Sequence, residues 1–261
     1  MKGEFLFLGT GGSSGVPMIG CECAVCTSTL SQNNRLRSSG LIQIEGKSFL
    51  IDAGPDFRQQ ALKHKIHHLD AVLFTHAHSD HISGIDDLRA YYILHHKRIP
   101  CILSQETYEE IKLRFHYLVQ PHVEGKSFPA QLDFQILKGD TGTFVHEGIE
   151  IGYFTYFQSE IKVTGFRFGN FAYVSDIKTY SEKIFDSLQG VETLVLSALR
   201  HEPSPMHFSI EEAIAFARRV GARMTYLTHL AHDLEHNETN ALLPPDVRMG
   251  YDGLKIPVTL A

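Results

Sequence analysis

Hydrophobic stretches of strand length recur along the chain. Most of them are rich in β-branched or aromatic residues, and Gly, Asp, Asn or Pro bounds them at either end. This pattern predicts strands over residues 5–8, 41–44, 48–51, 71–74, 101–103, 134–137, 149–154, 171–174, 193–196 and 224–227. The early part of the chain is rich in strand pairs, whereas the later part mixes strands with helices.

Apolar residues at helical spacing separate several of these strands. They predict helices over residues 56–65, 82–95, 106–118, 181–188 and 209–220. Ser209 and Glu212 have the spacing of a capping box at the start of the last helix. Because the apolar faces of sheets need cover, the sequence predicts an α/β protein of two sheets with helices on their outer faces. No linker or repeat interrupts the pattern, so we expect a single domain over residues 1–261.

Composition narrows the class of protein. The chain has 261 residues, of which 43% are hydrophobic and 21% charged, as in ordinary globular proteins. The formal net charge is −6 and no basic run exceeds Lys97-Arg98, so a nucleic-acid partner is not expected. No apolar stretch approaches the roughly 18 residues of a membrane span, and the first residues lead directly into a strand. We therefore expect a cytoplasmic protein without a membrane span or signal peptide.

The strongest chemical signal is a string of four metal-ligand side chains within six residues. His76, His78, Asp80 and His81 lie between the strand over 71–74 and the helix expected from Ile82. In such a turn, alternate residues converge on one point and the next two swing toward a second. His76 and His78 can therefore hold one cation, and Asp80 and His81 another. A solvated His-rich turn is the alternative, and this spacing disfavours it. We expect Asp80 and His81 to face an open cleft.

A second cluster contains three of the four cysteines. Cys21, Cys23 and Cys26 lie within six residues, a spacing that fits a metal better than a disulfide framework. Three thiolates indicate a tetrahedral zinc with a structural role. The alternative is three chance thiols in a loop. Cys101 is interpreted as a core residue.

The string of residues 76–81, with Leu50-Ile51-Asp52-Ala53-Gly54 upstream, resembles the metallo-β-lactamase superfamily of metal-dependent hydrolases. Residues 8–11, 21–26, 84–89, 228–232 and 251–253 are similar to the subgroup typified by the phosphodiesterase of the carbon–phosphorus lyase pathway. Matching landmarks run from residue 5 to residue 256. The resemblance implies an αββα sandwich with the site at one edge of the two sheets.

The resemblance also implies roles for four residues outside these strings. Asp176 would bridge the two active-site cations, and His229 would be the last ligand of the second. His232 would be the fourth ligand of the structural zinc. His207, just before the last predicted helix, would contact the scissile phosphate and protonate the leaving oxygen.

One position departs from the family pattern. The third histidine expected for the first cation falls on Gln158. A neutral amide oxygen is a poorer zinc ligand than imidazole, so the first cation would be weakly bound, harder than zinc (manganese, for example) or absent. Glu160 is close enough in sequence to be the ligand in place of Gln158. The third ligand of the first cation therefore stays open between these two residues.

These observations predict a metal-dependent phosphodiesterase with two divalent cations, zinc or manganese, at the active site and one structural zinc. A hydroxide shared by the cations, oriented by Asp80, would attack phosphorus, and His207 would act as general acid. The expected substrates are small phosphodiesters of nucleotides or sugars, cyclic ones included. Arg89 and Arg37 are candidate contacts for the substrate phosphate, with structural ion pairs as the alternative.

Two alternative functions stay open. One is a tRNA 3′-processing endonuclease, although no basic insertion that would grip tRNA is evident. The other is a non-catalytic or specialised relative similar to quinone-cofactor biosynthesis proteins, which Gln158 favours and the intact residues 76–81 disfavour. The sequence does not determine the oligomeric state, for which a homodimer is one alternative.

Overall fold

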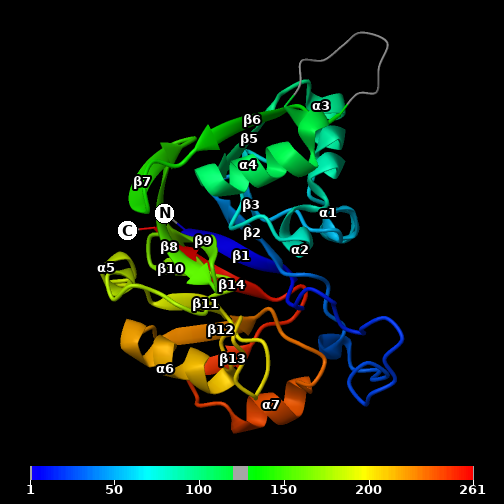
Figure 1. Ribbon diagram of the computed structural model, residues 1–261, viewed down its shortest axis with the longest axis vertical. Coiled ribbons are helices and arrows are strands. Elements are labelled where there is room, and N and C mark those ends of the chain that lie inside the picture. Colours follow the sequence, from blue (N-terminus) through cyan, green and yellow to red (C-terminus); the bar gives the residue numbers. More distant parts are fainter. Residues whose placement is uncertain (1, 120–128, 261) are drawn as a thin grey trace.

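The structure is a computed structural model that describes residues 2–119 and 129–260, and its described strands form two seven-stranded sheets (Figure 1). In spatial order, the first sheet consists of β14 (Lys255–Thr259), β1 (Lys2–Gly9), β2 (Ser39–Ile44), β3 (Lys47–Ile51), β4 (Ala71–Leu73), β5 (Ile99–Leu103) and β6 (Leu132–Ile136). The second consists of β13 (Val247–Met249), β12 (Met224–Thr228), β11 (Thr193–Ser197), β10 (Phe171–Val174), β9 (Ile161–Phe168), β8 (Ile149–Gln158) and β7 (Thr141–His146).

Helices lie on the outer sides of both sheets (Figure 1). The first sheet has α1 (Phe57–His64), α2 (Ser79–Ile82), α3 (Arg89–His95) and α4 (Gln105–Arg114), and the second has α5 (Ile184–Ser187), α6 (Ile210–Val220) and α7 (His236–Leu242). Short 3₁₀ helices cover Ser31–Asn33, Ile85–Leu88 and His116–Leu118. The αββα sandwich is thus confirmed. Within the described ranges, no helix is long and apolar enough to cross a membrane.

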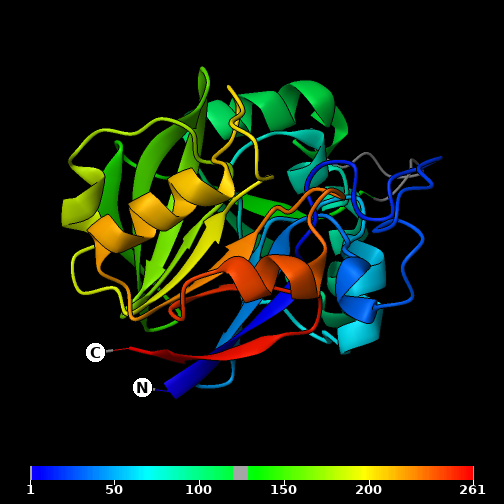
Figure 2. The ribbon, with the colours of Figure 1, turned by 90° about the horizontal axis from the view of Figure 1, so that it is seen from below.

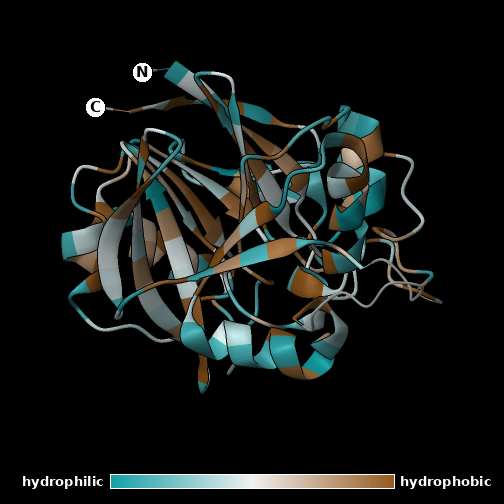
Figure 3. Ribbon diagram, turned by 90° about the horizontal axis from the view of Figure 1, so that it is seen from above, coloured by the Kyte–Doolittle hydropathy of each residue, from teal (hydrophilic) through white to brown (hydrophobic). Residues whose placement is uncertain are grey.

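Three apolar layers hold the sandwich together. The middle layer lies between the sheets and is rich in aromatic rings. The ring centroids of Phe5 (β1) and Phe171 (β10) are 4.9 Å apart, and those of Phe49 (β3) and Phe168 (β9) are 5.6 Å apart. Each outer layer packs a sheet against its helices. Figure 3 shows hydrophobic residues concentrated on the inner strands and hydrophilic ones on the outer helices. Since a fully buried Phe contributes about 1.5–3 kcal/mol, the middle layer joins the two sheets strongly.

Two predicted helices are interrupted. The helix expected over 82–95 is split into α2, a 3₁₀ turn and α3, and the interruption lies at Gly84. A Cβ there would lie 2.1 Å from the carbonyl oxygen of Gly54, so the chain approaches too closely for any other residue. The helix expected over 106–118 ends at Arg114, because Phe115 leaves the helical region with φ −120° and ψ 46°. The predicted capping box is present: Ser209 Oγ accepts from Glu212 N, and the Glu212 carboxylate accepts from Ser209 N.

Several elements were not predicted from the pattern, namely β7, β9, β13, β14 and α7. β7, β13 and β14 are edge strands or lie next to solvent, and their polar residues hide the strand pattern. β14 even contains Pro257, which the edge position tolerates. In β9, Lys162, Thr164 and Arg167 interrupt the apolar residues. β1 and β14 pair antiparallel, so the two ends of the chain lie side by side (Figure 2).

Candidate metal centre

Both sheets contribute to the site, through residues that follow strand ends. The turn over 76–81 follows β4 of the first sheet, whereas Asp176 follows β10 and His229 follows β12 of the second. The backbone of Asp176 (φ 53°) and of His229 (φ 59°) is left-handed. This conformation is uncommon for residues other than Gly and is maintained by the surrounding structure, which is typical of functional sites. Rigid strands therefore aim these side chains at one place.

Two groups of ligand-type side chains converge there. In the first group, His76 Nε2 lies 3.0 Å from His78 Nδ1 and 3.8 Å from Asp176 Oδ2. In the second, Asp80 Oδ2 lies 3.4 Å from both His81 Nε2 and His229 Nε2. Each group can hold a cation, because its ligand atoms lie within 4.8 Å of one another.

The Asp176 carboxylate lies between the two groups. Its Oδ1 is 3.5 Å from His81 Nε2, and its Oδ2 is 3.3 Å from His229 Nε2. The same Oδ2 faces His76, so one side chain reaches both groups. The structure thus places Asp176 where the resemblance implies a bridging carboxylate.

The donor set fits divalent cations. Ligand atoms about 2.0–2.1 Å from a tetrahedral zinc are separated by roughly 3.3 Å, close to the distances found here. His81 provides a second indication: its Nδ1 contacts Asp52 Oδ2 at 2.7 Å, whereas its buried Nε2 has no hydrogen-bond partner among the described residues. That nitrogen faces the carboxylates of Asp80 and Asp176, at 3.4 and 3.5 Å, where a bound cation would be its partner.

The electrostatics of the group are strongly coupled. Burial alone would raise the pKa of Asp80, but the charge of His81 and a hydrogen bond from His229 outweigh it and hold the pKa far below its usual range. Burial lowers the pKa of His76, whereas for His81 the carboxylates of Asp176, Asp80 and Asp52 outweigh burial and raise it. The centre is thus built around two ionised carboxylates that attract positive charge.

Two positioning contacts were missed by the sequence interpretation. Asp52, at the end of β3, is fully buried and accepts hydrogen bonds from Thr75 N and Thr75 Oγ1, both at 2.8 Å, besides its contact with His81. Ser175 Oγ donates to Asp176 Oδ1 at 2.7 Å. Such partners orient ligands and are common around metal sites. Asp52 belongs to the string that carries the family resemblance, which was the available signal.

Position 158 does lie at the centre. Gln158 ends β8 with a side chain that is buried, and its Nε2 lies 3.3 Å from Asp176 Oδ2. Glu160 is exposed in the turn after β8, away from the metal-ligand groups of the described residues. His207 approaches from the loop before α6, with Nδ1 3.9 Å from Asp176 Oδ2. Burial, followed by the charge of His229, lowers the pKa of His207 to about 4.

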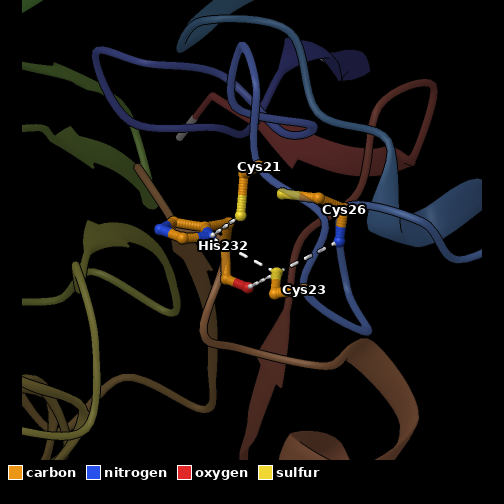
Figure 4. Close-up of side chains that lie close together, drawn as sticks. All are labelled: Cys21, Cys23, Cys26 and His232. Carbon is orange, nitrogen blue, oxygen red and sulfur yellow. Dashed lines mark hydrogen bonds between the residues drawn. The ribbon is translucent and has the colours of Figure 1, made fainter.

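The three cysteines and His232 form a separate cluster (Figure 4). His232 Nδ1 lies 3.4 Å from Cys21 Sγ and 3.5 Å from Cys23 Sγ, and Cys26 N donates to Cys23 Sγ. This hydrogen bond, together with the one from His232, lowers the pKa of Cys23 to about 6. Three thiols and an imidazole in such an arrangement fit a closed zinc site. Cys101 is fully buried in β5.

A cavity of about 340 Å³ opens beside Asp80. Its walls are lined by Ser13, Ser14, Met18, Ile19, Arg37, Pro55, Ser79, Asp80 and Ser83. The expectation that Asp80 faces a cleft holds, but for His81 it is wrong, because the histidine is packed under the turn with no exposed surface. The arginine beside the cavity is Arg37, paired with Asp56 at 3.0 Å, whereas Arg89 pairs with Asp86 at 3.4 Å.

Comparisons with known proteins agree with this fold and site. The family model described as "Beta-lactamase superfamily domain" matches residues 47–230. The chain belongs to the metallo-β-lactamase superfamily, whose members are metal-dependent hydrolases. Within it the chain is PhnP-like: a solved structure described as a new diphosphatase from the PhnP family is 35% identical, covers 100% of this chain and 98% of its own, and has a TM-score of 0.92.

Curated relatives match the chain over part of their length. An octanoyltransferase of Porphyromonas gingivalis is 35% identical over 260 residues, which cover 96% of this chain and 50% of that protein. A coenzyme PQQ synthesis protein B of Methylobacterium nodulans is 32% identical over 100 residues, or 33% of each chain. The chain thus spans about half the length of the octanoyltransferase.

Proposed function

We propose that the protein is a metal-dependent phosphodiesterase that hydrolyses small phosphodiesters, cyclic ones included, of nucleotides or sugars. The observation that carries the proposal is the Asp176 carboxylate, which lies between two groups of ligand-type side chains beside a small cavity. Two adjacent cations are the usual device for hydrolysing phosphate esters. The similar structure described as a diphosphatase supports phosphorus as the reacting centre.

Six side chains would hold the cations. His76 and His78 would bind the first, Asp80, His81 and His229 the second, and Asp176 both, with Gln158 beside the first. When bound, divalent cations lower the pKa of water to about 7 and neutralise charge on phosphate oxygens. Cys21, Cys23, Cys26 and His232 would hold a structural zinc away from the reaction.

The protein's own groups would prepare the attack. Asp80 belongs to the second group and also lines the cavity. Its carboxylate can therefore accept a hydrogen bond from a water molecule and orient that water toward a substrate. Asp52 holds the ring of His81 in place through Nδ1, which fixes the direction of Nε2. Serine hydroxyls on the cavity wall can donate to phosphate oxygens.

The size of the cavity favours a small substrate. A volume of about 340 Å³ lies at the lower end of the range for small-molecule sites. A tRNA would need a broad basic surface, which the net charge of −6 does not favour. Gln158 favours the alternative of a specialised relative, and the measured rate of diester hydrolysis distinguishes it from the proposed activity.

Hydrolysis of bis-p-nitrophenyl phosphate tests the proposal. We expect turnover with manganese or zinc, loss of turnover after chelation, and a loss of more than about 100-fold in Asp80→Asn, which keeps the shape but removes the charge. His95→Ala, in an exposed part of α3, is the matched control and should leave the rate unchanged. A metal-loaded protein without activity on this diester or on nucleoside 2′,3′-cyclic phosphates would refute the proposal. Faster turnover of a dinucleoside diphosphate would reassign it to diphosphate cleavage.

A further inference from the structure

The centre contains an imidazole that the two metal-ligand groups described above leave unused. Gln158 replaces the third histidine expected for the first cation, yet its amide occupies the expected place, 3.3 Å from Asp176 Oδ2. The same amide nitrogen lies 2.8 Å from His207 Nε2. Gln158 therefore connects the Asp176 carboxylate to a histidine from a different element.

His207 reaches the same carboxylate oxygen from the loop before α6. Its Nδ1 is 3.9 Å from Asp176 Oδ2, and its side chain is only 12% exposed. The ring stacks on that of His229, with centroids 4.8 Å apart and an angle of 23° between the planes. The ligand atoms of a third group, His207, Asp176 and His229, lie within 4.8 Å of one another. This group shares Asp176 with the first group and His229 with the second.

We propose that His207 is a metal ligand in this chain and supplies the imidazole that position 158 has lost, with Gln158 as its positioning residue. This inference rests on the two-cation centre of the proposed function. Metal-bound histidines usually donate a hydrogen bond through their second ring nitrogen. Here Gln158 Nε2 lies closer to His207 Nε2 (2.8 Å) than to His207 Nδ1 (3.4 Å), and Nδ1 is the ring nitrogen that faces Asp176.

The orphaned oxygen of Gln158 supports this arrangement. Gln158 Oε1 is buried and has no hydrogen-bond partner among the described residues. The two ends of an amide exchange by a half turn, which would let Oε1 accept the proton of His207 Nε2. A cation on Asp176 would remove the repulsion between that oxygen and the carboxylate. Loading the centre would thus give Oε1 a donor, with the NH₂ group turned to the side that Oε1 leaves.

The ligand role differs from the general-acid role that the resemblance implies. A nitrogen bound to a cation has no proton to donate, and the other ring nitrogen faces Gln158. The cavity beside Asp80 is lined by residues other than His207. A general acid that never binds metal would leave cation affinity unchanged when it is removed, so metal binding separates the two roles.

Calorimetric titration of manganese into protein stripped by mild chelation tests the inference. We expect His207→Ala and His207→Asn to weaken one of two binding events at least about tenfold, as loss of a ligand should. His207→Ala with Gln158→His should restore the affinity to within about threefold, because the imidazole returns from β8. His201→Ala, an exposed histidine of the same loop, is the matched control and should bind as the parent does. The absorption spectrum of the cobalt-loaded protein should change in His207→Ala and return in the double variant.

Two outcomes overturn the inference. One is unchanged affinity for both ions in the folded His207 variants, and the other is a loss that Gln158→His fails to restore. Two variants at position 207 ensure that poor folding of one does not decide the result. Activity on the diester is measured separately: unchanged metal affinity in an active enzyme overturns the ligand role alone. The expected binding results in a protein inactive on every diester overturn the proposed function alone.

Discussion

Asp52 presents no atom to the cations, yet three hydrogen-bonding groups converge on it: His81 Nδ1, Thr75 N and Thr75 Oγ1. In Asp52→Asn an amide NH₂ would face His81 or Thr75 N, both of which donate. The His81 ring would lose the partner that fixes its tautomer. We expect cation affinity to fall about 10- to 100-fold, measured by calorimetry. The exposed Asp133→Asn is the control. Affinity within twofold of the parent would show that Asp52 does not orient the site.

The carboxyl group of Asp252 should make the free energy of unfolding depend on pH. It accepts hydrogen bonds from Leu36 N at 2.7 Å and Thr10 Oγ1 at 2.8 Å, and burial raises its pKa from 3.8 to about 6. The folded protein thus holds the proton more tightly than the unfolded chain, so this group adds stability as the pH falls from about 6 toward 4 and loses it as the pH rises.

Asp252→Asn does not titrate in this range and isolates the effect. The free energy of unfolding of the parent minus that of the variant should grow by roughly 2–3 kcal/mol between pH 7 and pH 4. Urea unfolding of both proteins at several pH values, with chelator present, measures it. A difference that stays constant across this range would place the pKa of Asp252 near its ordinary value.

Among the elements, the loop that contains Cys21, Cys23 and Cys26 has little regular structure and a small apolar cluster of its own. Such a loop depends on its zinc, because a closed thiolate site contributes about 10 kcal/mol or more of binding free energy. We expect the purified protein to retain one zinc through mild chelation, and Cys23→Ser to lose it together with thermal stability. Elemental analysis measures the zinc content, and melting curves measure the thermal stability. Cys101→Ser is unsuitable as a control because Cys101 is a core residue. Thr27→Ala, on the same loop, serves instead. Full zinc content in Cys23→Ser would contradict the assignment.

Features were predicted well where the residues that define them lie close together in the sequence. Residues 76–81 form one short string, so their chemistry was readable directly, and Ser209 with Glu212 lies within four residues. Asp176 and His229 are single residues that only the family resemblance singled out. The break at Gly84 depends on a contact with Gly54, thirty residues earlier, which no local pattern encodes.

At the scale of the whole molecule, the centre exists only when the sheets are packed together. His76 to His81 follow a strand of the first sheet, and Asp176 and His229 follow strands of the second. Cations bind this folded arrangement and not the unfolded chain, so they stabilise by mass action. At 100 times the dissociation constant the gain is about 2.7 kcal/mol, or roughly 5–10 °C in Tm for a protein of this size. Melting curves with and without manganese measure it, with Asp80→Asn as the control that should gain less.

The two-sheet architecture was predicted correctly, because strand and helix patterns are strong where both faces are buried. The middle layer of Phe5, Phe49, Phe168 and Phe171 is an example. The edge strands β7, β13 and β14 were missed, since solvent on one side permits polar residues and proline there. The distances within the centre could not be predicted from the sequence, because they depend on which strand ends become neighbours in the folded protein.

His229 and His232 are three residues apart, and they serve different clusters. The segment after β12 would therefore link the two proposed sites: zinc on the cysteines would fix His232 and restrict where His229 can lie. Any such coupling is reciprocal, so the factor by which zinc tightens manganese binding must equal the factor by which manganese tightens zinc binding. A cell short of zinc would then lose more than a structural ion. Its enzyme would also retain its catalytic cations less well, which makes turnover a readout of zinc supply.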